Sequence, residues 1–416
     1  MEAWQLADRL MAELLAAGAV ETPAVEEAMR TVPRHLFLPE VQIEDAYANE
    51  AIPTKVLDGK AVSSASQPAI VAVMLEQLQL RVGMRVLEIG AGTGYNAALL
   101  GHLVGPSGRV VSVDIDDDIV EGARRHLEDV GASNVAVALG DGGFGHKRGA
   151  PYDRIVLTVG AWDIAPAWWD QLAVGGRLVL PLSLRSVQRS VAFDKRNGSM
   201  ESASVRDCGF MRMRGGFAGP ERVVTVGSIT LTFDSEIDAG SIADLLARPV
   251  GRQELDLEIG TDECFGGLAL WLALGDPHYC SIDIRGGHES SGVPVAMTFG
   301  SGDRMICWSP ASFDGQSLAV LGRERDALVV EAFGTDNGCS DRLGEAVRQW
   351  DAAQRPDSRS LTIRAYRHRR EVPTEKGAIR IEKQRTTLLL QWRALGMAGD
   401  PTTPGPGAPS RDSLAR

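Results

Sequence analysis

Short apolar runs of strand length alternate with segments of helical periodicity between about residues 68 and 180. The apolar runs are RVLEI (85–89), RVVSVDI (109–115), VAVALG (135–140), RIVLTVG (154–160) and GRLVLPL (176–182). The helical segments between them are AALLGHLV (97–104), DIVEGARRHLEDVG (118–131) and IAPAWWDQLAVGG (164–176). Alternation of strand and helix predicts an α/β fold with a doubly wound, mostly parallel sheet.

The first 30 residues have apolar positions at helical spacing, which predicts one or two amphipathic helices. This segment contains Glu2, Asp8 and Glu13, and it lacks the basic start and the unbroken apolar run of a signal peptide. No stretch of the chain approaches the 18 consecutive apolar residues that a membrane-spanning helix needs. We therefore expect a cytoplasmic protein without a membrane partner.

The pattern changes after about residue 218, where many short strand-like segments alternate with a few helical ones. Predicted strands include VVTVGSITLTF, QELDLEIG, CSIDIRGG, VAMTFG, SLAVLG, ALVVEAF, SLTIRAYRHR and TTLLLQWR, and predicted helices include ADLLARP and CSDRLGEAVRQWDAA. We predict a first domain over 1–217, an additional α+β domain over 218–395, and a disordered tail over 396–416, which is rich in Pro, Gly, Thr and Ser.

Charge and cysteine content narrow the class of protein. The chain has 43 Lys and Arg against 55 Asp and Glu, a formal charge of −12, which argues against a nucleic-acid partner because phosphate binding needs a surplus of cations. The five cysteines lie far apart without a CxxC pair, so we predict neither a disulfide framework nor a metal site.

The sharpest motif is VLEIGAGTGY (86–95), in which Gly90, Gly92 and Gly94 follow a predicted strand and precede a helix. Glycines at such a turn let backbone N–H groups approach a ligand closely. The GxGxG spacing lacks the third glycine of the dinucleotide fingerprint, and the absence of a GK[ST] motif disfavours a nucleoside triphosphatase. The next strand ends at Asp114, where an acid can accept hydrogen bonds from a ribose diol, and Asp141 follows the third strand at the same sheet edge.

Several motifs then resemble one family in order and spacing, from about residue 25 to about residue 217. These are AMRTVPRHLFLPE, AYANEAIP, SSASQPAIVAVMLEQLQLRVGMRVLEIGAGTGYNAALL, GDGG and APYDRIVLTVGAWDIAPAWWDQLAVGGRLVLPL. They are similar to the protein-L-isoaspartate O-methyltransferase family. The resemblance implies an enzyme that uses S-adenosyl-L-methionine to methylate the free carboxylate of an isoaspartyl residue, after which the ester collapses to a succinimide.

The resemblance also assigns residues to roles. Glu88 occupies a position where such methyltransferases commonly have an acid that orders the loop and favours the cationic end of the cofactor. The cofactor-binding residues implied in this way are Glu88, Gly90, Ala91, Gly92, Thr93, Gly94, Asp114, Ile115, Asp141 and Gly142.

The acceptor motif of the family, Thr-x-Ser-x-Pro, corresponds here to Ser64-Ala65-Ser66-Gln67-Pro68. Ser66 then takes the position of the active-site serine, and Ser63 and Ser64 supply further hydroxyls. A helix N-cap cluster before Pro68 explains the same serines equally well. Arg34 and His35 of the PRHLF motif are either structural or in contact with the peptide.

Three departures from the family bear on the substrate. The stretch TKVLDGKAV before the serines is several residues longer than usual, Ser64 replaces threonine, and about 180 further residues follow the catalytic region. This combination resembles the long bacterial members associated with ribosomally made peptide natural products such as lanthipeptides and graspetides, which methylate an aspartate of a precursor peptide. We therefore favour a precursor-peptide substrate, with substrate recognition as the role considered for the added domain, over general repair of isoaspartyl proteins or a non-catalytic peptide-binding protein.

Overall fold

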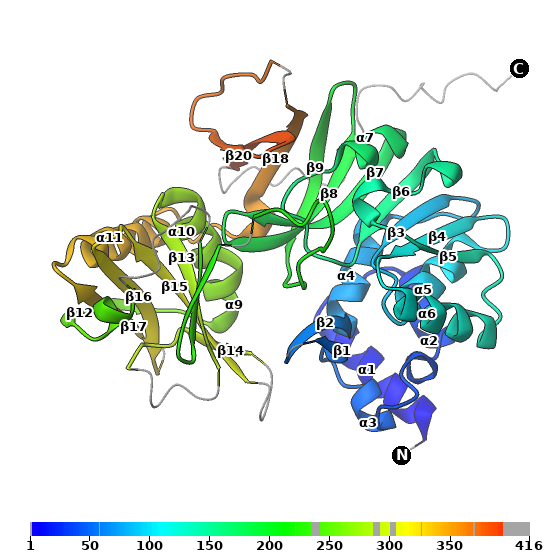
Figure 1. The fold of residues 1–416 in the computed structure, drawn as a ribbon, viewed down its shortest axis with the longest axis horizontal. Helices are drawn as coiled ribbons and strands as arrows, with labels where there is room; N and C mark the ends of the chain where they lie inside the picture. The colour runs from blue at the N-terminus through cyan, green and yellow to red at the C-terminus, as the bar shows by residue number, and fades with distance from the viewer. Residues whose placement is uncertain are drawn as a thin grey trace, which may run out of the picture.

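The computed structural model describes residues 2–57, 59–220, 222–233, 242–285, 292–299, 305–325, 327–368 and 371–393. Within these residues the strands form a two-stranded hairpin, a ten-stranded sheet and an eight-stranded sheet (Figure 1). The tail over 396–416, which we predicted to be disordered, lies outside the described residues.

Two helices open the chain, as the periodicity predicted. They are α1 (Ala3–Ala16) and α2 (Pro23–Thr31), followed by the 3-10 turn Arg34–Phe37 and the short helix α3 (Ile43–Ala46). The backbone N–H of Val25 donates to Oγ1 of Thr22 (3.4 Å), which caps α2 directly before Pro23. The apolar sides of α1 and α2 are buried in one core with α4 (Pro68–Leu78) and the parallel strands.

The parallel part of the ten-stranded sheet has the order β7-β6-β3-β4-β5, and every neighbouring pair in it is parallel. Its strands are β3 (Arg85–Ile89), β4 (Arg109–Asp114), β5 (Val135–Leu139), β6 (Tyr152–Leu157) and β7 (Leu172–Leu184). The crossover helices are α5 (Tyr95–Val104), α6 (Asp117–Asp129) and α7 (Pro166–Gln171). The prediction of a doubly wound α/β sheet is confirmed for this part.

One predicted helix is too long. The segment 164–176 forms a helix only over α7, and β7 begins at Leu172, which pairs with Tyr152 of β6. Pairing with a neighbouring strand outweighs the helical pattern of LAV in this segment.

The same sheet continues beyond β7 as antiparallel strands in the order β8-β9-β18-β20-β19. These strands are β8 (Val187–Lys195), β9 (Ser199–Asp207), β18 (Leu361–Arg367), β19 (Ile379–Glu382) and β20 (Thr386–Trp392). Met200 of β9 pairs with Ala365 of β18, so a late part of the chain returns to the first sheet. The sheet is therefore mixed, parallel from β7 to β5 and antiparallel beyond.

The second sheet is antiparallel, with the order β10-β11-β13-β15-β16-β17-β12 and with β14 paired to β15. Its strands are β10 (Val223–Val226), β11 (Ile229–Phe233), β12 (Pro249–Glu258), β13 (Tyr279–Arg285), β14 (Met297–Phe299), β15 (Ile306–Phe313), β16 (Ser317–Glu324) and β17 (Ala327–Gly334). The accompanying helices are α8 (Ile242–Leu246), α9 (Thr261–Glu263), the π-helical turn Cys264–Leu268, α10 (Ala269–Gly275) and α11 (Gly338–Ala352). An α+β second region is thus present, as predicted.

The predicted boundaries of that region differ from the division of the strands. Residues 218–395 contribute both the second sheet and the strands β18–β20 of the first sheet. One apolar core also joins the two sheets, since buried Leu268 and Leu272 belong to the same cluster as Leu178 and Val191 of the first sheet. None of the described helices is long and apolar enough to cross a membrane.

Candidate active site

The loop after β3 brings its backbone to the carboxyl edge of the parallel strands. Gly90 has a φ of 99°, and a Cβ added there would lie 2.5 Å from Oγ1 of Thr158 and 3.0 Å from Cγ1 of Val159. Oγ1 of Thr158 also donates a hydrogen bond to the carbonyl oxygen of Gly90 (2.6 Å). Only glycine fits this backbone position, because any side chain would collide with the end of the neighbouring strand.

Gly92 lies where the predicted cofactor side and acceptor side of the site meet. Its backbone N–H donates to Oδ2 of Asp114 (3.2 Å), and a Cβ added to it would lie 3.7 Å from the carbonyl oxygen of Ser64. The glycine loop, the acid after β4 and the serine-rich strand therefore converge on one residue.

A cavity of about 1070 Å³ opens at this point. Most of the residues that we assigned to the cofactor line it, namely Gly90, Ala91, Gly92, Thr93, Asp114, Ile115 and Gly142. Ser63, Ser64 and Ser66 line the same cavity. The carboxylate of Asp114 accepts hydrogen bonds from the backbone N–H groups of Gly92 and Asp116, and the side chain of Ile115 is 38% exposed.

Glu88 is placed differently from our expectation. It is fully buried and does not line the cavity. Its carboxylate accepts hydrogen bonds from Oγ of Ser112 and from Nδ2 of Asn96 (2.7 Å), the second of which lies in the first turn of α5. Burial raises the pKa of Glu88 to about 7. Glu88 thus orders the loop and helix from beneath, without direct contact with a ligand in the cavity.

Two further predicted cofactor residues also lie outside the cavity lining. Gly94 has a φ of 89°, and its Cβ position is 3.3 Å from the carbonyl oxygen of Ala123, so it lets α5 approach α6. Asp141 accepts hydrogen bonds from the backbone N–H groups of Gly143 and Gly216, each at 2.8 Å. Its carboxylate therefore fastens the segment after β9 to the sheet edge.

The serines stand at the end of an antiparallel hairpin formed by β1 (Ile52–Leu57) and β2 (Lys60–Ala65). Oγ1 of Thr54 donates to Oγ of Ser63 (3.0 Å), while Ser64 and Ser66 are half-buried. The helix α4 begins directly after them with Pro68, and its N-cap residue, Gln67, makes no side-chain capping hydrogen bond. The alternative in which the serines serve as N-caps is therefore not observed for α4.

Arg34, whose role the sequence left open, supports this serine turn. Its Nε donates to the carbonyl oxygen of Ala46 and its Nη2 to the carbonyl oxygen of Ser66, each at 2.9 Å. The guanidinium is 5.2 Å from the ring centroid of Tyr95, and the residue is 1% exposed yet lines the cavity. Nη1 is buried without a hydrogen-bond partner in the part of the chain that the structure describes. Arg34 is thus structural in its observed contacts, and its Nη1 still has both N–H groups available.

An ionic cluster at the cavity rim was not predicted from the sequence. Asp116, which precedes α6, accepts from Nζ of Lys55 (2.9 Å) and from Nη2 of Arg214 (2.7 Å). Lys55 lies on β1, and Arg214 lies on the segment after β9 that also lines the cavity. Asp116 therefore holds together β1 and the segment after β9, which are far apart in the sequence. Spacing alone gives no signal for such a cluster.

The cavity also extends to residues of the second sheet region, namely Phe265, Asp283, Thr298, Phe299 and Ile306. Figure 1 shows β14 on the side of the second sheet that faces the β1–β2 hairpin. Within the described residues no group of three or more His, Cys, Asp and Glu gathers as metal ligands would. The geometry therefore describes a cleft between the sheet edge that holds the glycine loop and a wall from the second sheet region.

Comparison with known proteins agrees with this geometry. The family model for protein-L-isoaspartate(D-aspartate) O-methyltransferase matches residues 5–216. The chain belongs to this family. The protein-L-isoaspartate O-methyltransferase of Methanopyrus kandleri is 38% identical over 218 residues, which cover 51% of this chain and 94% of that protein. The enzyme of the same name from Methanothrix thermoacetophila is 46% identical over 158 residues, which cover 38% of this chain and 73% of that protein.

Among solved structures, a protein-L-isoaspartate O-methyltransferase superposes with a TM-score of 0.48 at 21% identity, covering 86% of this chain and 96% of its own. A Plasmodium falciparum protein in complex with S-adenosyl-L-homocysteine superposes with a TM-score of 0.44 at 18% identity, covering 50% of this chain and 97% of its own.

Membership of the protein-L-isoaspartate O-methyltransferase family makes the chain an S-adenosyl-L-methionine-dependent protein carboxyl O-methyltransferase. The cavity fits this cofactor. Gly90 and Gly92 expose backbone at its wall, the Asp114 carboxylate faces it, and Ile115 offers an apolar surface. The family match ends near Gly216, so the second sheet and β18–β20 lie outside it.

Proposed function

We propose that this methyltransferase modifies the side-chain carboxylate of an aspartyl-type residue in a ribosomally made precursor peptide, in the cytoplasm. The observation that carries the proposal is the single cavity that joins the glycine loop, the serine turn and the second sheet region. The five cysteines are free and buried, which fits a reducing compartment.

The methyl transfer needs no proton transfer by a residue of the protein. An aspartyl-type carboxylate has a pKa of about 4, so it is already ionised at neutral pH and needs no general base. When bound, S-adenosyl-L-methionine supplies a methyl group whose C–S bond breaks as the carboxylate oxygen forms the O–C bond, leaving a neutral thioether. The task of the residues is to hold that oxygen in line and to exclude water, and much of the rate can come from such positioning.

Each part of the cleft has a role in this scheme. Asp114 accepts hydrogen bonds from the ribose diol, and the backbone of the glycine loop holds the amino-acid end of the cofactor. The hydroxyls of Ser63, Ser64 and Ser66 donate to the acceptor carboxylate, and they orient it without the strong neutralisation that a paired arginine would impose. Arg34 keeps the serine turn in place through the carbonyl oxygen of Ser66. The product ester then collapses to a succinimide as the following backbone nitrogen attacks it and methanol leaves.

The extent of the cavity supports a particular client over general repair. The cavity of about 1070 Å³ lies at the upper end of the range of about 300–1,000 Å³ for small-molecule pockets, and its lining continues past the serine turn to the second sheet region. A second wall supplied by an added region suits one constrained client better than many unrelated damaged proteins.

Two substitutions test the assignment of the cleft. Asp114→Ala should weaken cofactor affinity roughly 10- to 100-fold, because it removes hydrogen bonds to a charged acceptor. Ser66→Ala should lower kcat roughly 10-fold or more with cofactor affinity nearly unchanged. The exposed residues Asp129 and Ser133 provide matched controls as Asp129→Ala and Ser133→Ala. Unchanged calorimetric cofactor affinity in the Asp114 variant would contradict the assignment.

A substrate comparison tests the client. The protein is incubated with cofactor and either a short linear isoaspartyl peptide or an aspartate-containing precursor peptide cyclised by its own modifying enzymes. We expect the mass gain of a methyl ester, followed by loss of methanol, on the cyclised peptide. Efficient turnover of the linear isoaspartyl peptide instead supports repair, and absence of cofactor binding by calorimetry supports a non-catalytic peptide-binding protein.

A further inference from the structure

The far wall of the acceptor cavity is aromatic and comes from the second sheet region. Phe265 lies on the π-helical turn, and Phe299 lies on β14 with 38% of its surface exposed. Their ring centroids are 5.6 Å apart in an edge-to-face arrangement, and the Phe265 ring also lies 6.1 Å from that of Trp308. Both phenylalanines line the same cavity as Ser64 and Ser66. An apolar surface therefore stands in the cavity that holds the methyl-accepting carboxylate.

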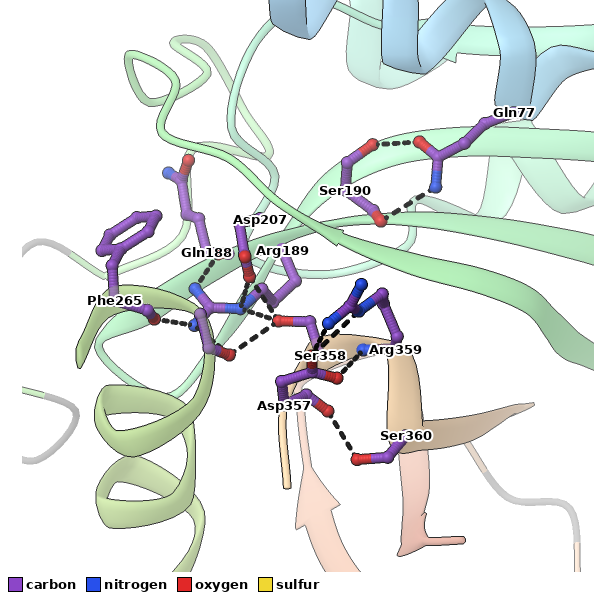
Figure 2. A network of polar contacts seen from close by, with 11 residues as sticks. Gln77, Gln188, Arg189, Ser190, Asp207, Phe265, Asp357, Ser358, Arg359 and Ser360 are labelled. Carbon is purple, nitrogen blue, oxygen red and sulfur yellow. Dashed lines mark hydrogen bonds and ion pairs between the residues drawn. The ribbon is translucent and has the colours of Figure 1, made fainter. Parts of the chain in front are cut away.

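A fully buried arginine holds this wall against the first sheet. Figure 2 shows Arg189 of β8 between Asp207, Ser358 and the carbonyl group of Phe265. Nη2 donates to the carbonyl oxygen of Phe265 (2.5 Å), Nε donates to Oγ of Ser358 (2.7 Å), and Nε lies 3.1 Å from Oδ1 of Asp207. The guanidinium is also 5.1 Å from the centroid of the Phe265 ring.

Arg189 is 0% exposed, and its hydrogen bonds to Ser358 and to the Phe265 carbonyl oxygen hold the backbone of Phe265 against β8.

The residue beside Arg189 holds a second residue of the cavity lining. The side-chain amide of Gln188 accepts from the backbone N–H of Phe210 (2.8 Å) and donates to the carbonyl oxygen of Phe210 (3.1 Å). Phe210 lines the cavity as part of the segment that follows β9. Adjacent residues of β8 thus hold two residues of the cavity lining, Phe265 and Phe210, through hydrogen bonds to their backbones.

From this geometry we propose that Phe265 and Phe299 form a specificity pocket that takes an apolar, preferably aromatic, side chain close in sequence to the methyl-accepting residue of the client peptide. The inference rests on the proposed function, because the serine turn in the same cavity fixes where the acceptor lies. Asp283 adds a carboxylate to the same wall, so an acidic side chain at that point of the client is disfavoured by the proximity of two acids.

The test measures the binding of fluorescently labelled, cyclised precursor peptides in the presence of S-adenosyl-L-homocysteine, by fluorescence anisotropy. Each peptide has one aspartyl acceptor, and a single Phe, Ala or Glu is placed in turn at each flanking position. At one or more positions Phe should strengthen binding about 10-fold or more over Ala, as expected for burying an aromatic side chain, and Glu should weaken it.

Variants of the wall connect this preference to the two rings. In Phe299→Ala the gain from Phe should fall below about 3-fold, whereas Phe299→Leu should keep a larger part of it. Val250→Ala removes an exposed apolar side chain from β12 at the far edge of the same sheet, and it should behave as the unmodified protein. Cofactor affinity should stay the same in all three variants.

The outcomes separate the two hypotheses. Equal binding of Phe and Ala peptides at every position, or an undiminished gain in Phe299→Ala, overturns the specificity pocket even if the peptides are methylated. If none of the peptides is methylated, the cyclised precursor included, the proposed function is contradicted. The ratio of the binding constants of the Phe and Ala peptides still shows whether the specificity pocket exists.

Discussion

Glu88 shows how one residue beneath the glycine loop couples the site to protein stability. The side chain is fully buried, and its carboxylate is held by Ser112 of β4 and Asn96 of α5. Burial raises its pKa from the usual 4.5 to about 7. The folded protein therefore binds a proton that the unfolded chain releases between these two values, and stability must fall as the pH rises through this window.

We expect Glu88→Gln to remove this dependence on pH. In the unmodified protein the raised pKa corresponds to a loss of about 3 kcal/mol in the free energy of unfolding between pH 4.5 and pH 7. Glutamine stays neutral throughout and keeps a carbonyl oxygen for Asn96, so the variant should gain stability relative to the parent as the pH rises. Urea unfolding at pH 5, 6, 7 and 8 measures the difference, with Glu128→Gln on the exposed side of α6 as control. Parallel stability curves for parent and Glu88→Gln would contradict the assignment.

For single residues, the sequence predicted the strand ends at which they lie but not the orientation of every side chain. Gly90, Gly92 and Asp114, which we predicted to bind the cofactor, all line the cavity, because their positions at the ends of parallel strands determine where their backbones lie. Asp141 occupies the correct strand end, yet its carboxylate bonds to the backbone of Gly143 and Gly216. Spacing predicts which edge of a sheet a residue reaches, whereas the orientation of its side chain depends on partners from distant segments.

The hairpin β1–β2 and the segment after β9 are joined by an ionic cluster beside Asp114 at the rim of the cavity. Lys55 from the hairpin and Arg214 from the later segment both bind Asp116. The hydrogen bond from Arg214, followed by that from Lys55, lowers the pKa of Asp116, so the acid stays charged at neutral pH. The Asp116 side chain makes no capping hydrogen bond to α6, which leaves the two cations as its main partners.

We predict that Asp116→Asn loosens these two elements and speeds the release of the cofactor. Exposed or half-buried ion pairs contribute about 0.2–1 kcal/mol each, so dissociation should accelerate roughly 2- to 10-fold while the melting temperature changes little. Stopped-flow displacement of S-adenosyl-L-homocysteine measures the rate. The matched control is Asp118→Asn, which loses only an exposed contact to Lys55. Equal rates in the two variants would show that the cluster does not restrain the cleft.

Element prediction succeeded where the periodicity was local and failed where distant pairing decides. The strands β3 and β5 follow the predicted runs closely, because each is a short, largely apolar run of strand length, although β5 at the edge of the sheet is only partly buried. The strand β15 was missed, since Pro310 argues against a central strand and yet pairs with Ser281 of β13. The return of β18 to the side of β9 has no local signal at all.

The pairing of the late strand β18 with β9 joins the C-terminal part of the chain to the first sheet. Leu390 of β20 is 0% exposed, pairs with Ile363 and Ile379, and belongs to the core that includes Trp168 of the first sheet. A C-terminal segment outside the family match is thus part of the sheet that binds the cofactor. We therefore expect the catalytic sheet and β18–β20 to unfold as one cooperative unit.

Leu390→Ala in the full chain tests this unit. Removing a buried leucine costs about 2–5 kcal/mol, which corresponds to a fall of roughly 5–15 °C in the melting temperature. The fall should appear in the thermal transition that S-adenosyl-L-homocysteine shifts upward, because a ligand stabilises the unit that binds it. Gln391→Ala on the same strand should change that transition by less than about 2 °C. The opposite result would be two transitions, of which Leu390→Ala lowers only the one that the ligand does not shift. That result would show that β20 folds separately from the catalytic sheet.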